Sequence, residues 1–292
     1  MNLYSRTILT LSAHALVGLA MFAFVPQLHA QENYFVTYSQ ELEEPGNLEI
    51  ATKNVTGAPK GGNPFVATAL EFEYGVKTWW TTELYLDGQT TAGESTLFTG
   101  FRLEDRVRPL LREHWINPVL YFEFEDINGA DKALLEVVGH DSRTDIATRN
   151  DRSEKKREAE FKLILSSNFR GWNVSENIIA EKNLNNSPWE FGYALGASRA
   201  LALAASAKPC KFCRENFVLG AEMYGGLGER YSFGLPDTSH YLGPVVTWSI
   251  PRGPTLRLSP NFGLNQNSNV FLFRFMLSYE IDQLFSKLGS SR

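Results

Sequence analysis

The chain has only two cysteines, Cys210 and Cys213, separated by Lys211 and Phe212. A Cys-x-x-Cys spacing can form a redox-active pair or supply half of a zinc site. This pair follows a proline, and no second cysteine pair or nearby histidine accompanies it. The sequence therefore favours a small disulfide that closes a turn and leaves a redox or metal role as the alternative. We expect no metal and no other cofactor.

Three histidines lie beyond residue 30, namely His114, His140 and His240. Ser239 precedes His240, but adjacency in sequence is not the geometry of a nucleophile and its base, and no Gly-x-Ser-x-Gly motif occurs. The acidic neighbours of His114 share their segment with three arginines, which favours a solvated loop over a cation site. We predict that the chain is not an enzyme. A lipid-modifying enzyme that uses His240 is the weakest alternative.

The best candidates for functional residues are charged residues that alternate with apolar ones. If they face a common aqueous interior, they could set ion or solute preference, as charged rings do in pores. The alternative is that they neutralise one another and close that interior. The candidates are Glu71, Glu73, Glu83, Arg102, Glu123, Glu125, Lys162, Arg199, Glu222, Arg257 and Arg274.

Residues 270–281 show best which element positions these charges. Phe271, Phe273 and Phe275 begin one face of this stretch, whereas Arg274 and Glu280 lie on the other. Side chains alternate across a strand, so the stretch predicts a β-strand with one apolar and one charged face. In a soluble sandwich the apolar face points into the core. In a membrane barrel it points to lipid, and the charges point into a wet lumen.

Similar alternation predicts strands along most of the chain. Turns are expected at Asp87-Gly88 and Arg170-Gly171, and a hairpin at Asn128-Gly129. Polar loops are expected at residues 57–64, 105–115, 139–158 and 226–240. The expected strands are residues 32–43, 48–53, 65–75, 79–87, 97–104, 119–126, 133–138, 159–167, 172–180, 190–206, 216–225, 241–250, 255–264 and 270–281.

The number of strands and the position of aromatic residues decide between sandwich and barrel. About 20 residues per strand and connection correspond to roughly 12 to 14 strands. Aromatic residues near strand ends are typical of the girdles of a membrane barrel, and they include Trp79, Trp80, Trp115, Trp172, Trp189, Trp248 and Tyr279. The sequence therefore predicts an all-β fold, an antiparallel up-and-down transmembrane β-barrel.

The first 30 residues have the pattern of a secretory signal. Arg6 is the only charge before a long apolar run, and Leu28-His29-Ala30 offers a cleavage site. An uncleaved membrane anchor is the alternative. We expect a signal peptide at 1–30, a barrel at 31–281 and a tail at 282–292. The net charge of −5 gives no electrostatic case for nucleic-acid binding.

These patterns together resemble bacterial outer-membrane β-barrel proteins as a class, including porin-like and transporter-like members. The resemblance covers most of the chain after Ala30 but rests on no signature motif, and the tail beyond Ile281 departs from the aromatic ending common in such barrels. It implies export to the bacterial outer membrane, contact with membrane lipid and passage of small solutes or ions. We expect a passive channel or transporter-like protein gated by the loops 139–158 and 226–240. A closed barrel with a structural or surface-binding role is the alternative.

Overall fold

The computed structural model describes residues 32–58, 63–131, 137–139, 153–185, 187–208 and 210–284. In these residues one sheet contains twelve long strands and a two-residue strand, β10 (Ser232–Phe233), and a single 3-10 turn, η1 (Arg214–Asn216), precedes β9. The long strands are β1 (Leu48–Gly57), β2 (Phe65–Lys77), β3 (Trp80–Thr91), β4 (Ser95–Val107), β5 (Asn117–Asn128), β6 (Lys155–Phe169), β7 (Trp172–Asn183), β8 (Trp189–Ala200), β9 (Phe217–Glu229), β11 (His240–Ser249), β12 (Thr255–Gly263) and β13 (Phe271–Ile281).

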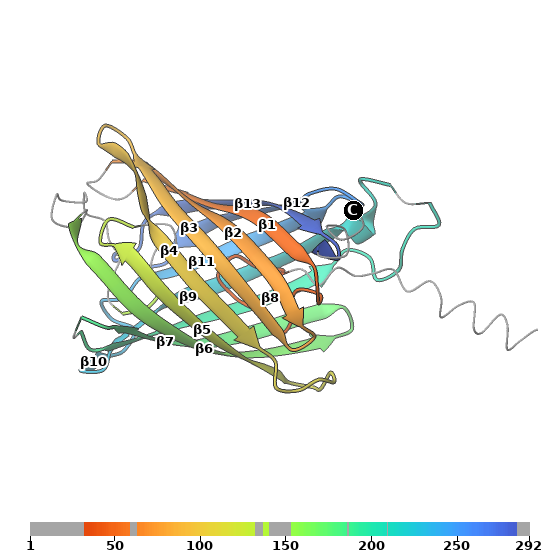
Figure 1. Ribbon diagram of the computed structural model, residues 1–292, viewed down its shortest axis with the longest axis horizontal. Helices are drawn as coiled ribbons and strands as arrows, with labels where there is room; N and C mark the ends of the chain where they lie inside the picture. Colours follow the sequence, from red (N-terminus) through yellow and green to blue (C-terminus); the bar gives the residue numbers. More distant parts are fainter. Residues whose placement is uncertain are drawn as a thin grey trace, which may run out of the picture.

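The long strands form a closed antiparallel barrel (Figure 1). Each pairs with its neighbours along the chain, β9 joins β8 to β11, and β13 pairs with β1 from Leu48↔Ile281 to Gly57↔Leu272. The prediction of an antiparallel up-and-down transmembrane barrel of about 12–14 strands is confirmed. Among the described residues, no helix has the length and apolar character that crossing a membrane would require.

The barrel is apolar outside and polar inside. On β13, Phe271, Leu277 and Tyr279 are exposed, whereas Arg274 and Ser278 are buried. A soluble sandwich would bury the aromatic face, because burial of apolar surface drives its folding. Here the charged face is the enclosed one, as a membrane barrel requires.

The barrel has two distinct ends. The termini end is where β1 begins at Leu48 and β13 finishes at Ile281, and the loop end is where β5 finishes at Asn128 and β6 begins at Lys155. In Figure 1 the termini end lies on the right. Five of the six tryptophans lie at or next to the termini end, and Trp189 lies at the loop end.

Residues 32–47 form no strand, so the prediction of a strand over 32–43 is wrong. This internal segment enters the barrel, and Tyr34, Val36, Thr37 and Tyr38 are each at most 8% exposed. The segment bends at Phe35, Val36 and Gln40 instead of running as a strand. The backbone of residues 35–38 bonds to side chains of the wall, and near the end of the segment Gly46 and Asn47 bond to the backbone of Gly75 in β2.

Several predicted boundaries also change. Asp87-Gly88 is a bulge inside β3 rather than a turn, β5 pairs with β6 rather than forming a hairpin at Asn128-Gly129, and β4 continues to Val107. Residues 155–158 belong to β6 instead of a loop, and residues 226–229 belong to β9. The turn at Arg170-Gly171 is confirmed, with both residues at positive φ. The predicted signal (1–30), most of the tail, residues 132–136 and most of the loop 139–158, including His140, lie outside the described residues.

Candidate functional site: a charged lumen closed by an internal segment

Ten of the eleven charged candidates lie on the inward face of the barrel. Nine are at most 7% exposed, and the side chain of Lys162 is 10% exposed. The nine are Glu71, Glu73, Glu83, Arg102, Glu123, Glu125, Glu222, Arg257 and Arg274. The expectation for Arg199 is wrong, because its side chain is on the outward face of β8 and lies over the ring of Trp172 at 5.6 Å. A long arginine side chain can reach the polar boundary of a bilayer from that position.

Glu222 holds the middle of the internal segment. Its Oε2 accepts hydrogen bonds from three successive backbone N–H groups, those of Phe35 (3.3 Å), Val36 (2.9 Å) and Thr37 (3.2 Å). Burial alone would penalise both the carboxylate and the unpaired N–H groups. The contact satisfies both, so Glu222 is a specific anchor for this backbone.

Asn177 supplies a second anchor one residue further along. Its Oδ1 accepts the N–H of Tyr38 at 2.6 Å and its Nδ2 donates to the carbonyl of Tyr38 at 2.9 Å. A strand partner would make this pair of bonds, so the side chain of Asn177 replaces one. Tyr34 is fixed in a similar way, because its hydroxyl donates to Oδ1 of Asn173 at 2.8 Å.

Two buried arginines hold the ends of the segment. Arg257 donates to the carbonyl of Tyr34 at 2.7 Å and also to the carbonyl of Glu32. Arg106 pairs with the Glu32 carboxylate at 2.6 Å and lies 3.5 Å from the carbonyl of Glu41. Side chains of β4, β7, β9 and β12 therefore bind one peptide segment from four sides of the lumen.

Arg106 is also the centre of the largest ion-pair network in the described part of the chain. Its guanidinium pairs with Glu73 at 2.6 Å, with Glu104 at 3.1 Å and with Glu83. The Tyr38 hydroxyl donates to Glu104 at 3.0 Å, which connects this network to the internal segment. Arg106 is 0% exposed, so water does not screen its ion pairs with these carboxylates.

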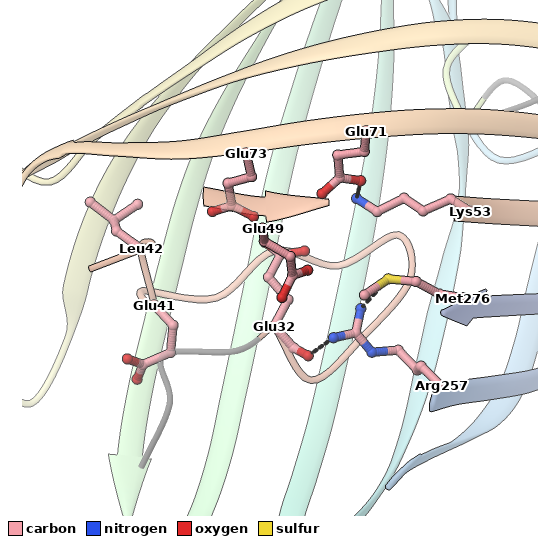
Figure 2. Close-up of a pocket in the computed structure, with 9 residues that line it drawn as sticks. All are labelled: Glu32, Glu41, Leu42, Glu49, Lys53, Glu71, Glu73, Arg257 and Met276. Carbon is pink, nitrogen blue, oxygen red and sulfur yellow. Dashed lines mark hydrogen bonds and ion pairs between the residues drawn. The ribbon is translucent and has the colours of Figure 1, made fainter. Parts of the chain in front are cut away.

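An acidic pocket lies beside the segment near Glu49, Glu71 and Glu73 (Figure 2). One carboxylate oxygen of each lies within 4.8 Å of the others. The ammonium of Lys53 is 2.6 Å from Oε2 of Glu71, and Glu32 of the segment closes one side. Lys53 therefore supplies a positive charge beside this group.

A second cavity, of about 60 Å³, lies on the other side of the segment. The segment contributes Phe35, Val36 and Tyr38, and β5, β6 and β7 contribute acidic residues. Val137 covers it from the connection after β5, and the next two residues pair with β8 and β9. Gly192 permits this approach, since a Cβ there would lie 2.5 Å from the carbonyl oxygen of Val137.

Sequence reasoning missed several wall residues that bind the segment or line the cavities. The loop predicted at residues 105–115 includes Arg106, although Arg106 continues the alternation of Arg102 and Glu104 into β4. Glu158 likewise continues inward in phase with Glu160. For Asn177 no signal was available, because an isolated asparagine in a strand does not reveal its partner.

His240 is buried among neutral partners. Its Nδ1 lies 3.0 Å from the Tyr193 hydroxyl, and its Nε2 lies 2.9 Å from Oγ1 of Thr238. Ser239 is 5% exposed, so neither it nor the imidazole is open to a bulky substrate. The described contacts of His240 are those of a structural histidine.

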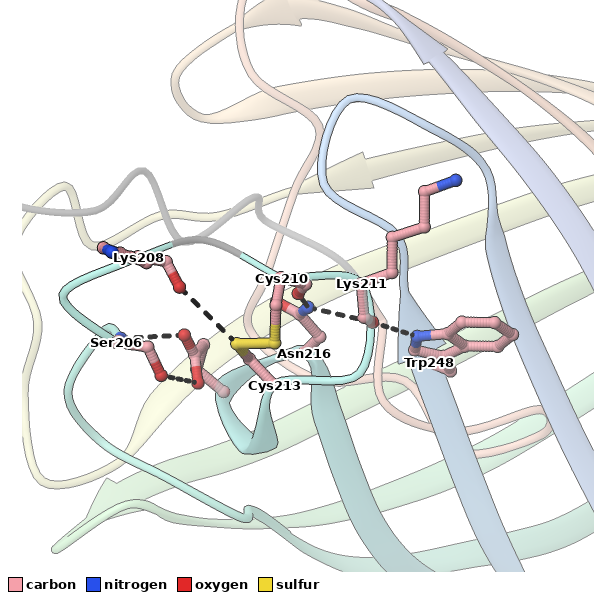
Figure 3. Close-up of a disulfide and its surroundings, with 8 residues drawn as sticks. Ser206, Lys208, Cys210, Lys211, Cys213, Asn216 and Trp248 are labelled. Carbon is pink, nitrogen blue, oxygen red and sulfur yellow. Dashed lines mark hydrogen bonds between the residues drawn. A yellow bond between two sulfur atoms is a disulfide. The ribbon is translucent and has the colours of Figure 1, made fainter.

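Cys210 and Cys213 form a disulfide in the connection between β8 and β9, at the termini end (Figure 3). Asn216 donates to the carbonyl of Cys210 at 2.6 Å, and the indole of Trp248 donates to the carbonyl of Lys211 at 2.8 Å. Nearby, the backbone N–H of Ser206 donates to the Glu215 carboxylate and lowers its pKa. The disulfide therefore belongs to a well-bonded surface connection, away from the lumen.

Replacing both cysteines by serine is expected to loosen this connection and leave the barrel folded. Closing so short a loop stabilises by at most about 2 kcal/mol in the chain-entropy model, and the hydrogen bonds of Asn216 and Trp248 remain. Limited proteolysis should cut residues 201–216 faster, while the heat-modifiable gel mobility of the folded barrel stays unchanged. A variant that no longer folds would contradict a purely local role.

No protein-family model and no curated protein sequence matches this chain. Among solved structures, the KdgM porin superposes with a TM-score of 0.49 at 7% identity, over 79% of this chain and 98% of that chain. An outer membrane channel from Pseudomonas putida F1 gives 0.48 at 10% identity, over 88% and 99%. LpxR from Salmonella typhimurium gives 0.41 at 10% identity, over 80% and 99%. At such distances these likenesses carry no argument about activity, and the closed ladder of twelve strands itself defines the fold.

Proposed function

We propose that this protein is a gated passive channel of the bacterial outer membrane, through which small solutes diffuse when residues 32–47 leave the lumen. The apolar outer face suits contact with membrane lipid. An even number of strands places both ends of the barrel sequence on one side. The tight turns β2–β3 and β6–β7 lie on that side, which suits the periplasm.

The observation that carries this proposal is the charge of the inner wall. The buried charged residues of the described chain are thirteen acidic and four basic, with Lys53 and Lys162 reaching in among them. Buried ion pairs are often no more stable than apolar packing of the same volume. A barrel that served only as a scaffold would be closed more simply by apolar side chains, so this wall suits contact with water and polar solutes.

The size of the barrel supports a removable plug. Eight strands enclose a space that side chains can fill, whereas sixteen or more leave an aqueous channel. Twelve strands lie between these limits, and here the internal segment lies in the space that they enclose. A channel of this size can therefore be closed by one peptide segment without changing its wall.

The contacts of the segment favour a closed state that can open. Each hydrogen bond between neutral groups of the segment and the wall contributes about 0.5–1.5 kcal/mol net, and each bond to the charged Glu222 about 1.5–3 kcal/mol, because water replaces these bonds when the segment leaves. Val36 and Leu42 add burial of roughly 1.5–3 kcal/mol each. These amounts favour closure by several kcal/mol, and the wall strands keep their own ladder when the segment moves.

Single-channel recording of the refolded chain from Gln31 onward tests the proposal. We expect brief stepwise openings from a closed baseline in a planar bilayer. Replacing Glu71, Glu73, Glu123 and Glu125 by glutamine should shift the reversal potential in a KCl gradient away from cation preference, because it removes carboxylates from the wall.

Glu176→Gln, on the outward face of β7, is the matched control and should leave the reversal potential unchanged. A folded barrel that stays silent at every voltage, even when its internal segment has been released, would overturn the channel. It would favour a closed barrel with a structural or surface-binding role.

A further inference from the structure

The cavity between the internal segment and β5–β7 has more acidic than basic lining groups. Glu125, Glu158, Glu160 and Glu181 come from three neighbouring strands, and the lining cations are Arg102, Lys162 and Arg274. All four glutamates are at most 7% exposed. Buried carboxylates attract a cation strongly, because water screens them poorly.

Glu125 forms no ion pair with the cations of the described residues. It is 4% exposed and lines the cavity. The neighbouring Arg102 guanidinium pairs with Asp87 at 2.9 Å and with Glu123 at 3.2 Å instead. The side chain that Glu125 does contact is the carboxyl of Glu123, another acid. Two carboxyl groups in such contact share a proton, and a cation that enters the cavity can take the place of that proton.

The wall already binds an ammonium group at this place. Nζ of Lys162 is 2.7 Å from Glu160 and lies over the rings of Tyr121 at 4.1 Å and Tyr38 at 4.7 Å. Carboxylate on one side and aromatic faces on the other is an arrangement that recognises organic ammonium ions. Lys162 therefore shows which chemistry this wall accepts.

The spacing of the carboxylates argues against a compact metal ion. In the described residues, the acidic group whose ligand atoms lie within 4.8 Å of one another is Glu49, Glu71 and Glu73, on the other side of the segment. The acids of the cavity between the segment and β5–β7 are not part of it. Spread carboxylates match a ligand whose positive charges are separated along a short chain.

We propose that this cavity binds small organic diammonium ions, with Glu125 and Glu181 as the principal acceptors. As a statement about which solutes cross the membrane, this inference rests on the proposed channel. As a statement about binding, it can be tested on the closed barrel.

The test is isothermal titration of the folded chain from Gln31 onward, in detergent micelles, with 1,3-diaminopropane at neutral pH. We expect saturable binding to one site, weakened at least tenfold by Glu125→Gln and also by Glu181→Gln. The outward Glu176→Gln has the same charge change and should bind as the unchanged chain does. Heat-modifiable gel mobility verifies that each variant is folded.

Equal affinity in Glu125→Gln, Glu181→Gln and the unchanged chain would overturn the proposal, as would the absence of binding heat. Competition by MgCl2 stronger than that by NaCl of equal ionic strength would also overturn it and indicate a divalent-metal site. Because titration needs no current, diamine binding to an electrically silent barrel would refute the channel and leave the site intact. A conducting barrel that binds no diamine would refute the binding site and leave the channel intact.

Discussion

Releasing the internal segment from the wall is expected to convert a mostly closed barrel into an open one. In Glu222→Ala/Asn177→Ala, the N–H groups of residues 35–38 and the carbonyl of Tyr38 lose their partners. Hydrogen bonds to a charged group contribute about 1.5–3 kcal/mol. A loss of about 3 kcal/mol changes the ratio of open to closed states on the order of 100-fold. Open probability in single-channel records measures this change.

A steric variant tests the same release without removing any charge. Gly196 lies against the segment, and a Cβ there would be 2.7 Å from the ring of Tyr34 and 3.0 Å from Cγ2 of Thr37. Gly196→Val places three carbons in that space, so the segment must move away. Its open probability should rise as in Glu222→Ala/Asn177→Ala.

Glu176→Gln serves as the control for both release variants, because it changes β7 on the side that faces away from the lumen. If both release variants fold and neither raises the open probability, the segment is a permanent part of the barrel interior rather than a gate.

Loss of Arg106 is expected to have the largest effect on stability. Arg106→Met leaves Glu32, Glu73, Glu83 and Glu104 without their shared counter-charge inside the barrel. Removing one partner of a buried ion pair costs about 3–5 kcal/mol, because the remaining charge stays buried and unpaired. Urea unfolding followed by loss of heat-modifiable mobility measures the change.

Two further variants, one partial rescue and one control, test whether the loss comes from the Arg106 network. Arg106→Met/Glu83→Gln should recover part of the loss, since it removes one of the unbalanced carboxylates. Arg199→Met removes an arginine from the outward face of β8 and should change the free energy of unfolding by less than about 1 kcal/mol. Similar losses for Arg106→Met and Arg199→Met would contradict the central role of the Arg106 network.

The sequence by itself determined the barrel and the face on which most charges lie. Strand periodicity assigns every second residue to one side, so Glu71 and Glu73, or Arg274 on β13, could be placed opposite the apolar residues without coordinates. Arg199 is instructive in this respect. It is in phase with Tyr193 and Leu195, which are on the outward face, and the alternation, applied strictly, would have placed it there too.

Only the tertiary structure decided what meets inside the lumen. Glu222 and Val36 are 186 positions apart, and Asn177 and Tyr38 are 139 apart. Periodicity reports the side of a strand but not which residue lies across the barrel. Closure of the strands brings residues that are distant in sequence into one enclosed space. For this reason only the tertiary structure shows the internal segment 32–47, its four anchors and the contact between Glu123 and Glu125.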